Sequence, residues 1–409
     1  MLRPFLPFLI LIASHGSALL SLLFLMKWLS PDDAGRLNTG LAIQGYVILI
    51  GTCGLRTLLV REVARDPRKL PYLLTNHYAI TSIAGLLVSF LALIMSTLFL
   101  GGTREELWMR LWLACGAWIA TTTPFPFLDA LGRQTRGLAI VAVTEVGFLA
   151  CLAGGMIPLE LPVIGAAFAI KWSITSVLHG VDLAQHGNHF SRKLSLSASL
   201  DLMIRAFPLM LTSLISTLPI TGTVVMVRLL CGIESSAVMG LASQLAGGYL
   251  LIAGVAYRYV QPQFRNIGDL KDLTRRRSLR RVAGLLLAAW MCLLAFSWGL
   301  THWGLPPIYG EGFPTIAALL VASLFGAASL VGWTTLLALE NERAIFWSYF
   351  FGALLFLISG WGLTRPWGSV GAAIAGCLGT GLTVVLMSIF HNRTLARLLR
   401  KPGLSRAVR

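Results

Sequence analysis

Long apolar stretches alternate with short polar segments along the whole chain. A helix that crosses the hydrocarbon core of a bilayer needs about 20 mostly apolar residues. The chain offers about twelve stretches of this kind, so we expect an all-α, polytopic membrane protein. The first six predicted spans are 4–29, 37–60, 72–100, 107–131, 137–157 and 162–181. The second six are 202–229, 237–260, 282–303, 313–339, 344–364 and 368–391.

The pattern repeats at half the length of the chain. Residues 40–44 read GLAIQ and residues 240–244 read GLASQ, while 165–169 read GAAFA and 371–375 read GAAIA. Recurrence at an offset of about 200 residues indicates two copies of one unit. Because six spans is an even number, both copies begin on the same side of the membrane and are related by an axis along its normal.

We therefore expect two pseudo-symmetric six-helix lobes around a central cavity. The predicted divisions are an N-terminal lobe at 1–181, a cytoplasmic linker at 182–201, a C-terminal lobe at 202–391 and a basic tail at 392–409. Small residues four positions apart let helix backbones approach closely. Ala372 with Gly376, and Ala375 with Gly379, predict such a packing face on the last span.

Basic residues gather in every second loop. Such an alternation follows the positive-inside rule, which places the basic loops and both termini in the cytoplasm. We expect the chain to lie in a bacterial cytoplasmic (inner) membrane. The basic loops and the tail contain Arg61, Arg65, Arg68, Lys69, Arg133, Arg136, Arg192, Lys193, Arg265, Lys271, Arg275, Arg276, Arg277, Arg343, Arg393 and Arg397. The other loops contain Asp32, Asp33, Glu105, Glu106, Glu160, Glu234 and Glu311 with few cations.

Composition changes the interpretation of the charge. The chain has 409 residues, 56% of them hydrophobic and 12% charged, with a formal net charge of +16. A soluble domain cannot bury so much apolar surface. The positive charge is explained by topology and anionic lipid head groups, so we expect no nucleic-acid partner. The six cysteines lie singly in apolar stretches without metal or redox spacing, and we expect no cofactor and no metal.

Four segments resemble the polysaccharide (O-antigen) flippase family of the multidrug/oligosaccharidyl-lipid/polysaccharide exporter superfamily. They are Leu29–Arg65, Phe207–Leu218, Val260–Leu273 and Pro307–Leu320. The first resembles the family's outer loop, second helix and following basic turn, and the others resemble the seventh helix and two further turns. The resemblance implies a transporter of polyprenyl-diphosphate-linked oligosaccharides. It also implies that the first, second, seventh and eighth spans line the cavity.

Charged side chains inside the predicted spans are the candidates for function, because a charge in hydrocarbon is costly unless it is paired or hydrated. Glu145 and Lys171 lie near the middle of the fifth and sixth spans. One interpretation is a mutual ion pair between the two helices. The other is that Lys171 faces the cavity and attracts phosphate, and the two are compatible if the cavity contains water.

Three arginines and a histidine complete the candidates. Arg56 and Arg205 lie about one turn inside the cytoplasmic ends of their spans, and Arg228 lies near an outer end. Their side chains can extend to the interface, or Arg56 and Arg205 can bind a diphosphate through bidentate contacts. His15, at the centre of the first span, is either a neutral histidine bonded to a neighbouring helix or, with Glu145, a proton-coupling group.

These observations give three hypotheses. The first is a flippase for lipid-linked oligosaccharides in cell-surface polysaccharide biosynthesis, working by alternating access, without being an enzyme. Its partners would be that substrate, membrane lipids and polysaccharide polymerase or chain-length machinery. The second is a cation-coupled multidrug antiporter of the same fold. The third, a membrane glycan polymerase or ligase, is disfavoured because the predicted outer loops are short.

Overall fold

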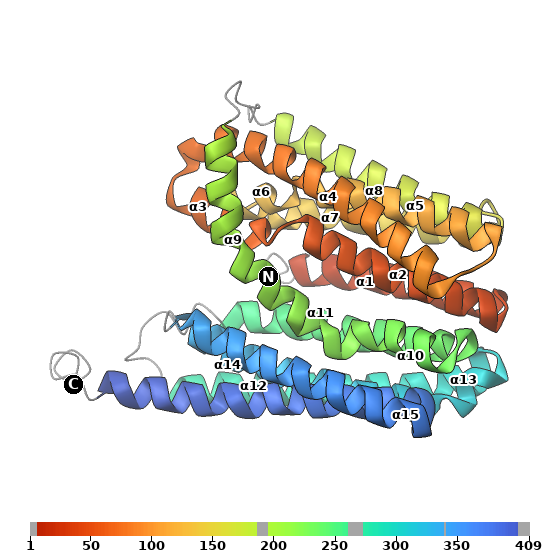
Figure 1. The fold of residues 1–409 in the computed structure, drawn as a ribbon. Helices are drawn as coiled ribbons and strands as arrows, with labels where there is room; N and C mark the ends of the chain where they lie inside the picture. Colours follow the sequence, from red (N-terminus) through yellow and green to blue (C-terminus); the bar gives the residue numbers. More distant parts are fainter. Residues whose placement is uncertain (1–5, 186–194, 261–272, 339–340, 400–409) are drawn as a thin grey trace. The chain divides into compact units, whose positions relative to one another are not determined.

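The computed structural model describes residues 6–185, 195–260, 273–338 and 341–399, and regular structure in these residues is helical throughout (Figure 1). The first half contains α1 (Leu6–Trp28), α2 (Pro31–Gly51), α3 (Leu55–Arg65), α4 (Leu70–Leu100), α5 (Arg104–Thr121), α6 (Phe125–Ala130), α7 (Gln134–Ala153) and α8 (Leu161–Ala184). The second contains α9 (Leu196–Thr217), α10 (Thr223–Cys231), α11 (Ile233–Val260), α12 (Leu273–Gly299), α13 (Pro307–Glu311), α14 (Phe313–Ala338) and α15 (Glu342–Leu399).

Ten helical runs in the described part of the chain are long and apolar enough to cross a membrane. One of them, Glu342–Thr394, contains two predicted spans, because Gly368 (φ 58°, ψ −140°) breaks the helical conformation inside α15. Polar residues such as Asn38 and Gln44 keep α2 less apolar, although its 21 residues have the length of a span. The predicted fold class, an all-α polytopic membrane protein, is confirmed.

Two predicted spans are interrupted. The stretch 37–60 was expected as one helix, but α2 ends at Gly51 and α3 begins at Leu55. Likewise the stretch 107–131 divides into α5 and α6 around Pro124, which lies directly before Phe125. Apolar runs do not reveal such interruptions, because apolar residues continue on both sides of each break.

The chain forms two compact units, unit 1 from Met1 to Leu214 and unit 2 from Ile215 to Arg409. The boundary falls inside a helical run in which α9, a π-helical turn (Leu218–Gly222) and α10 follow one another. Parts of the predicted linker, residues 186–194, and the end of the predicted tail, from residue 400, lie outside the described residues, as does 261–272 with Arg265 and Lys271.

In unit 1, α1 packs against α7 and α5 against α8, while α2 and α4 also contact α5. Figure 1 shows α3 at one end of this unit and the turn between α4 and α5 at the other. Three leucines of α3, Leu55, Leu58 and Leu59, are fully buried in a cluster with residues of α4, α6 and α9.

The break between α2 and α3 depends on Gly54. Its φ of +67° lies in the left-handed region that glycine adopts without strain. A Cβ atom there would lie 2.5 Å from the carbonyl oxygen of Ala206 and 2.6 Å from the nitrogen of Met210, both on α9. Only a glycine therefore allows both the turn and this close approach.

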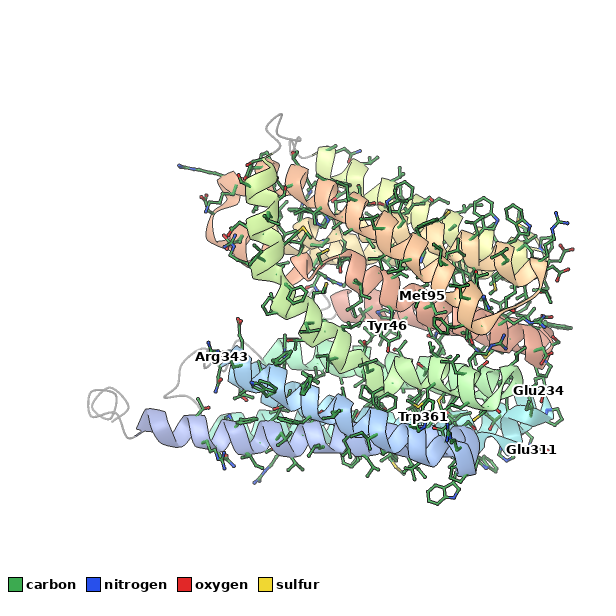
Figure 2. All side chains as sticks on the ribbon, in the orientation of Figure 1. Tyr46, Met95, Glu234, Glu311, Arg343 and Trp361 are labelled. Atoms are coloured by element: carbon green, nitrogen blue, oxygen red, sulfur yellow. The ribbon has the colours of Figure 1, made fainter. Side chains whose placement is uncertain are left out.

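In unit 2, α14 packs along α15, while α10 contacts α15 and α11 contacts α14. A Cβ atom on Gly376 would lie 2.6 Å from the carbonyl oxygen of Pro219, and one on Gly379 would lie 2.7 Å from that of Gly352. The predicted close packing of small residues on the last span is thus confirmed. Figure 2 shows Glu234 and Glu311 at one end of this unit and Arg343 at the opposite end, in line with the predicted alternation of loops.

Candidate functional site

A buried ion pair lies in the middle of two neighbouring helices of unit 1. Lys171 of α8 places its Nζ 2.8 Å from Oε1 of Glu145 on α7. The side chains are only 9% and 10% exposed, respectively. The ion pair, one of the two interpretations that the sequence left open, is therefore present, and it joins two helices at the depth where an isolated charge is most costly.

Hydroxyl groups continue this polar contact along the two helices. Thr175, one turn beyond Lys171, donates to Oγ1 of Thr144 at 3.0 Å and is also 2.8 Å from the carbonyl oxygen of Lys171. Thr144 directly precedes Glu145 on α7. Because a side chain four residues on lies over the same helix face, α7 and α8 meet through one continuous polar seam.

Aromatic rings surround the lysine ammonium. Its Nζ lies 5.1 Å from the ring centroid of Phe148, 4.8 Å from that of Phe168 and 5.6 Å from that of Trp172. All three distances are within the range of about 6 Å in which a cation is attracted to an aromatic ring face. The ammonium is thus held by one carboxylate and three rings.

His15 lies on a helix that neighbours this pair. It is a half-buried residue of α1, which packs against α7, the helix of Glu145. The second carboxylate oxygen of Glu145, Oε2, is buried and accepts no hydrogen bond from the described residues. The helices of three candidates that the sequence placed on separate spans, His15, Glu145 and Lys171, therefore pack together in unit 1.

Two of the candidate arginines lie near α3. Arg205 of α9 is 3.2 Å from Glu62 of α3 and 3.1 Å from Asp201 on its own helix, and its side chain is 45% exposed. Arg56, in the first turn of α3, is exposed and lies 4.9 Å from the ring centroid of Phe125. Arg228 is a buried residue of α10 and belongs to unit 2.

Sequence reasoning missed a second charged cluster, where α4 ends and α5 begins. Arg110 pairs with Glu106, and its Nη1 donates to the carbonyl oxygens of Ser96 at 2.9 Å and Gly101 at 2.8 Å. Arg36 of α2 reaches Glu106 at 3.6 Å. The four-residue spacing of Glu106 and Arg110 was the available signal, since it is the spacing of ion pairs along a helix.

A small cavity lies beside this second cluster. Its volume is about 20 Å³, which leaves room for roughly one water molecule and none for a lipid head group. Its lining includes Gly40, Gln44, Ser96, Arg110 and Leu113. We therefore interpret this cluster as a structural link between α2, α4 and α5 rather than as a substrate site.

Sequence reasoning also passed over His179 of α8. Its Nε2 lies 3.0 Å from the carbonyl oxygen of Gly137, and its Nδ1 lies 3.1 Å from Oγ1 of Thr123. A carbonyl oxygen only accepts, so Nε2 donates to Gly137. His179 thus connects α8 to α7 and to the segment between α5 and α6.

The group of Glu145, Lys171 and the surrounding rings is suited to binding a cation or exchanging a proton. Among the described residues, no group of three or more histidines, cysteines, aspartates and glutamates is placed to hold a metal ion. The carboxylate and the ammonium of the central pair cancel each other's charge, so this part of unit 1 has no net charge to attract a diphosphate.

No model of a known protein family matches the chain, and no curated protein matches it in sequence. Solved structures do match over nearly the whole chain. The lipid II flippase MurJ, in an inward closed conformation, has a TM-score of 0.70 at 12% identity and covers 95% of this chain and 89% of its own. An inward-facing multidrug resistance MATE family transporter of the MOP superfamily has a TM-score of 0.67 at 14% identity, covering 97% and 99%.

A third similar structure is a MOP superfamily transporter from Pyrococcus furiosus, whose binding pocket is described as having reverse polarity. It has a TM-score of 0.63 at 15% identity and covers 96% of this chain and 94% of its own. At these identities the likeness shows a shared fold, which is that of polytopic transporters and flippases.

Proposed function

We propose that the chain is a flippase that moves polyprenyl-diphosphate-linked oligosaccharides across a bacterial cytoplasmic membrane during cell-surface polysaccharide biosynthesis. The observation that carries the proposal is the whole-chain likeness to a structure named as a lipid II flippase. The resemblance of four sequence segments to oligosaccharide flippases supports the same function. Transport needs no covalent step, so it requires positioned charges and a moving scaffold rather than catalytic groups.

The diphosphate would be bound by cations at the end of unit 1 that carries α3. Arg56 is exposed there, and its planar guanidinium suits phosphate oxygens. Arg205, at the same end, is 45% exposed and lies 3.2 Å from Glu62 and 3.1 Å from Asp201. Arg56 and Arg205 are the residues to test in this region, and Arg228 in unit 2 is a further candidate.

The second candidate function is a cation-coupled multidrug antiporter, which the likeness to MATE transporters favours. A carrier of organic cations needs an accessible acidic group. Glu145 is a buried acidic group of unit 1 that fits this role, yet its carboxylate already holds Lys171 at 2.8 Å. This occupancy favours the flippase.

The decisive experiment is reconstitution of the purified protein in vesicles that contain a fluorescent polyprenyl-diphosphate oligosaccharide. A membrane-impermeant quencher, added outside, reports how much of the lipid has moved between leaflets. Protein-dependent equilibration of the lipid is expected. Vesicles in which a panel of such lipids stays in its own leaflet, while an organic cation is expelled along an ion gradient, would identify the antiporter instead.

The binding role of Arg56 has a matched control in the same region. Arg56→Ala and Arg68→Ala each remove one exposed positive charge, but Arg68 lies in the turn at Pro67–Lys69 beyond α3. We expect Arg56→Ala to slow flipping about tenfold or more, as loss of a charge-assisted hydrogen bond predicts, and Arg68→Ala to leave the rate nearly unchanged. Equal rates for the two variants would remove Arg56 from the site without removing the function.

A further inference from the structure

The ammonium of Lys171 lies against the carboxylate of Glu145 inside unit 1. The contact is direct, with 2.8 Å between Nζ and Oε1, and both side chains are about nine-tenths buried. Lysine reaches this position from α8 through a flexible chain of four methylene groups, whereas the carboxylate belongs to α7. The cation and its ligand therefore come from two different helices.

The surroundings of the ammonium have the composition of a cation-binding pocket. Three aromatic rings, those of Phe148, Phe168 and Trp172, lie 4.8–5.6 Å from Nζ, in addition to the carboxylate. Aromatic rings around a cation are the arrangement by which proteins recognise alkylammonium ligands. A lysine that served only to join two helices would need the carboxylate but not the three rings.

The internal repeat shows that the lysine is particular to unit 1. Lys171 lies six residues after the start of GAAFA, and Cys377 lies six residues after the start of GAAIA. Cys377 is directed at the carbonyl oxygen of Ala318, 2.9 Å away, so the equivalent position in unit 2 makes a neutral packing contact. The fold therefore does not require a cation at this position of the helix.

We infer that Glu145, Phe148, Phe168 and Trp172 form a binding site for a monovalent ammonium-type cation, and that the chain fills this site itself with the side chain of Lys171. The cation of this site is thus covalently part of unit 1, and the site binds no free cation. The site is complete within unit 1, so the inference holds whichever substrate the protein transports.

The test is to remove the tethered cation and supply a free one. Lys171→Ala deletes Cγ, Cδ, Cε and Nζ, which are the heavy atoms of propylammonium. The thermal unfolding of the full-length variant in detergent is followed during titration with propylammonium chloride, at ionic strength held constant with sodium chloride. We expect a saturable rise in melting temperature that recovers most of the loss caused by the substitution.

Three matched controls give this result its meaning. Propanol, which has nearly the same shape without the charge, is expected to give no shift with Lys171→Ala. Propylammonium is expected to give no shift with the unsubstituted protein, whose site is filled, and none with Glu145→Gln/Lys171→Ala, whose site lacks the carboxylate. If Lys171→Ala folds only when it is prepared in propylammonium and unfolds when the amine is diluted, that result also supports the proposal.

Two outcomes overturn the proposal. The first is the absence of rescue by propylammonium. Either Lys171→Ala folds and shows no saturable response to the amine, or it fails to fold even with the amine while Glu145→Gln/Lys171→Ala folds. The second is a shift of the unsubstituted protein with sodium or propylammonium that Glu145→Gln abolishes, because that would show Glu145 binding a free cation beside Lys171. Neither outcome depends on flipping, so the proposed function is tested separately.

Discussion

The last two spans of each half do the same structural task by different means. In unit 1, α7 and α8 meet through the pair of Glu145 with Lys171 and through hydrogen-bonded threonines. In unit 2, the two segments of α15 meet where Gly352 and Gly379 bring the backbones together, with Oγ1 of Thr383 3.4 Å from the carbonyl oxygen of Ser348. Helix pairs in a membrane can thus be joined by neutral small residues alone.

The difference teaches which groups in unit 1 go beyond the needs of the fold. Two helices packed through glycines have no charge to neutralise, whereas Glu145 and Lys171 must remain paired to be tolerated in the membrane interior. If one half has a feature and the other half folds without it, that feature is a candidate for function. The neutral Cys377 at the position equivalent to Lys171 makes this contrast specific to one residue.

The largest effect is expected from breaking the pair in unit 1. Lys171→Met leaves the carboxylate of Glu145 buried without its cation, which typically costs about 3–5 kcal/mol. Glu145→Gln/Lys171→Met removes both charges and is expected to unfold near the unsubstituted protein, because well-packed neutral side chains often replace a buried pair at little cost. Denaturant titration of the purified proteins measures both values. A double variant as unstable as the single one would show that the pair itself holds α7 to α8.

A smaller effect is expected at Gly54, where unit 1 uses a glycine for a turn rather than for helix packing. Gly54 and Gly132 both have positive φ, +67° and +73°, but a Cβ atom on Gly132 would meet nothing within 4 Å. Gly132→Ala should therefore lose only the conformational part, about 1–2 kcal/mol. Gly54→Ala should lose about 1–3 kcal/mol more through its contact with α9. Equal losses of stability for Gly54→Ala and Gly132→Ala in thermal unfolding would show that α9 moves to accommodate the new Cβ atom.

The smallest effect is expected from Gly376 in unit 2. A Cβ atom there would lie 2.6 Å from the carbonyl oxygen of Pro219, so Gly376→Ala should destabilise the protein by about 1–3 kcal/mol. Gly362→Ala is the control on the same helix, because a Cβ atom there meets nothing within 4 Å and alanine favours the helix by up to about 1 kcal/mol. If melting temperatures moved equally for both, close backbone packing would not be what joins α15 to the turn at Leu218–Gly222.

Hydrophobic periodicity was sufficient to predict the fold class and most of the spans, because both follow from what a bilayer tolerates. The ion pair of Glu145 with Lys171 was one of two interpretations that the sequence left open. The break at Gly54 was not predictable, since it depends on the backbone of α9, about 150 residues further along the chain. The three rings around Lys171 were not predictable either. Phe148, Phe168 and Trp172 look like ordinary apolar residues until α7 and α8 are placed side by side.

The neutrality of the central pair has an electrical consequence for the proposed flippase. The membrane field exerts about 2.3 kcal/mol per elementary charge per 100 mV, but opposite charges 2.8 Å apart feel almost no net force in it. If unit 1 brings no exchangeable cation, an anionic diphosphate crosses without a compensating partner. An interior-negative voltage then drives that anion outward, so transport becomes electrogenic and the membrane potential is its driving force.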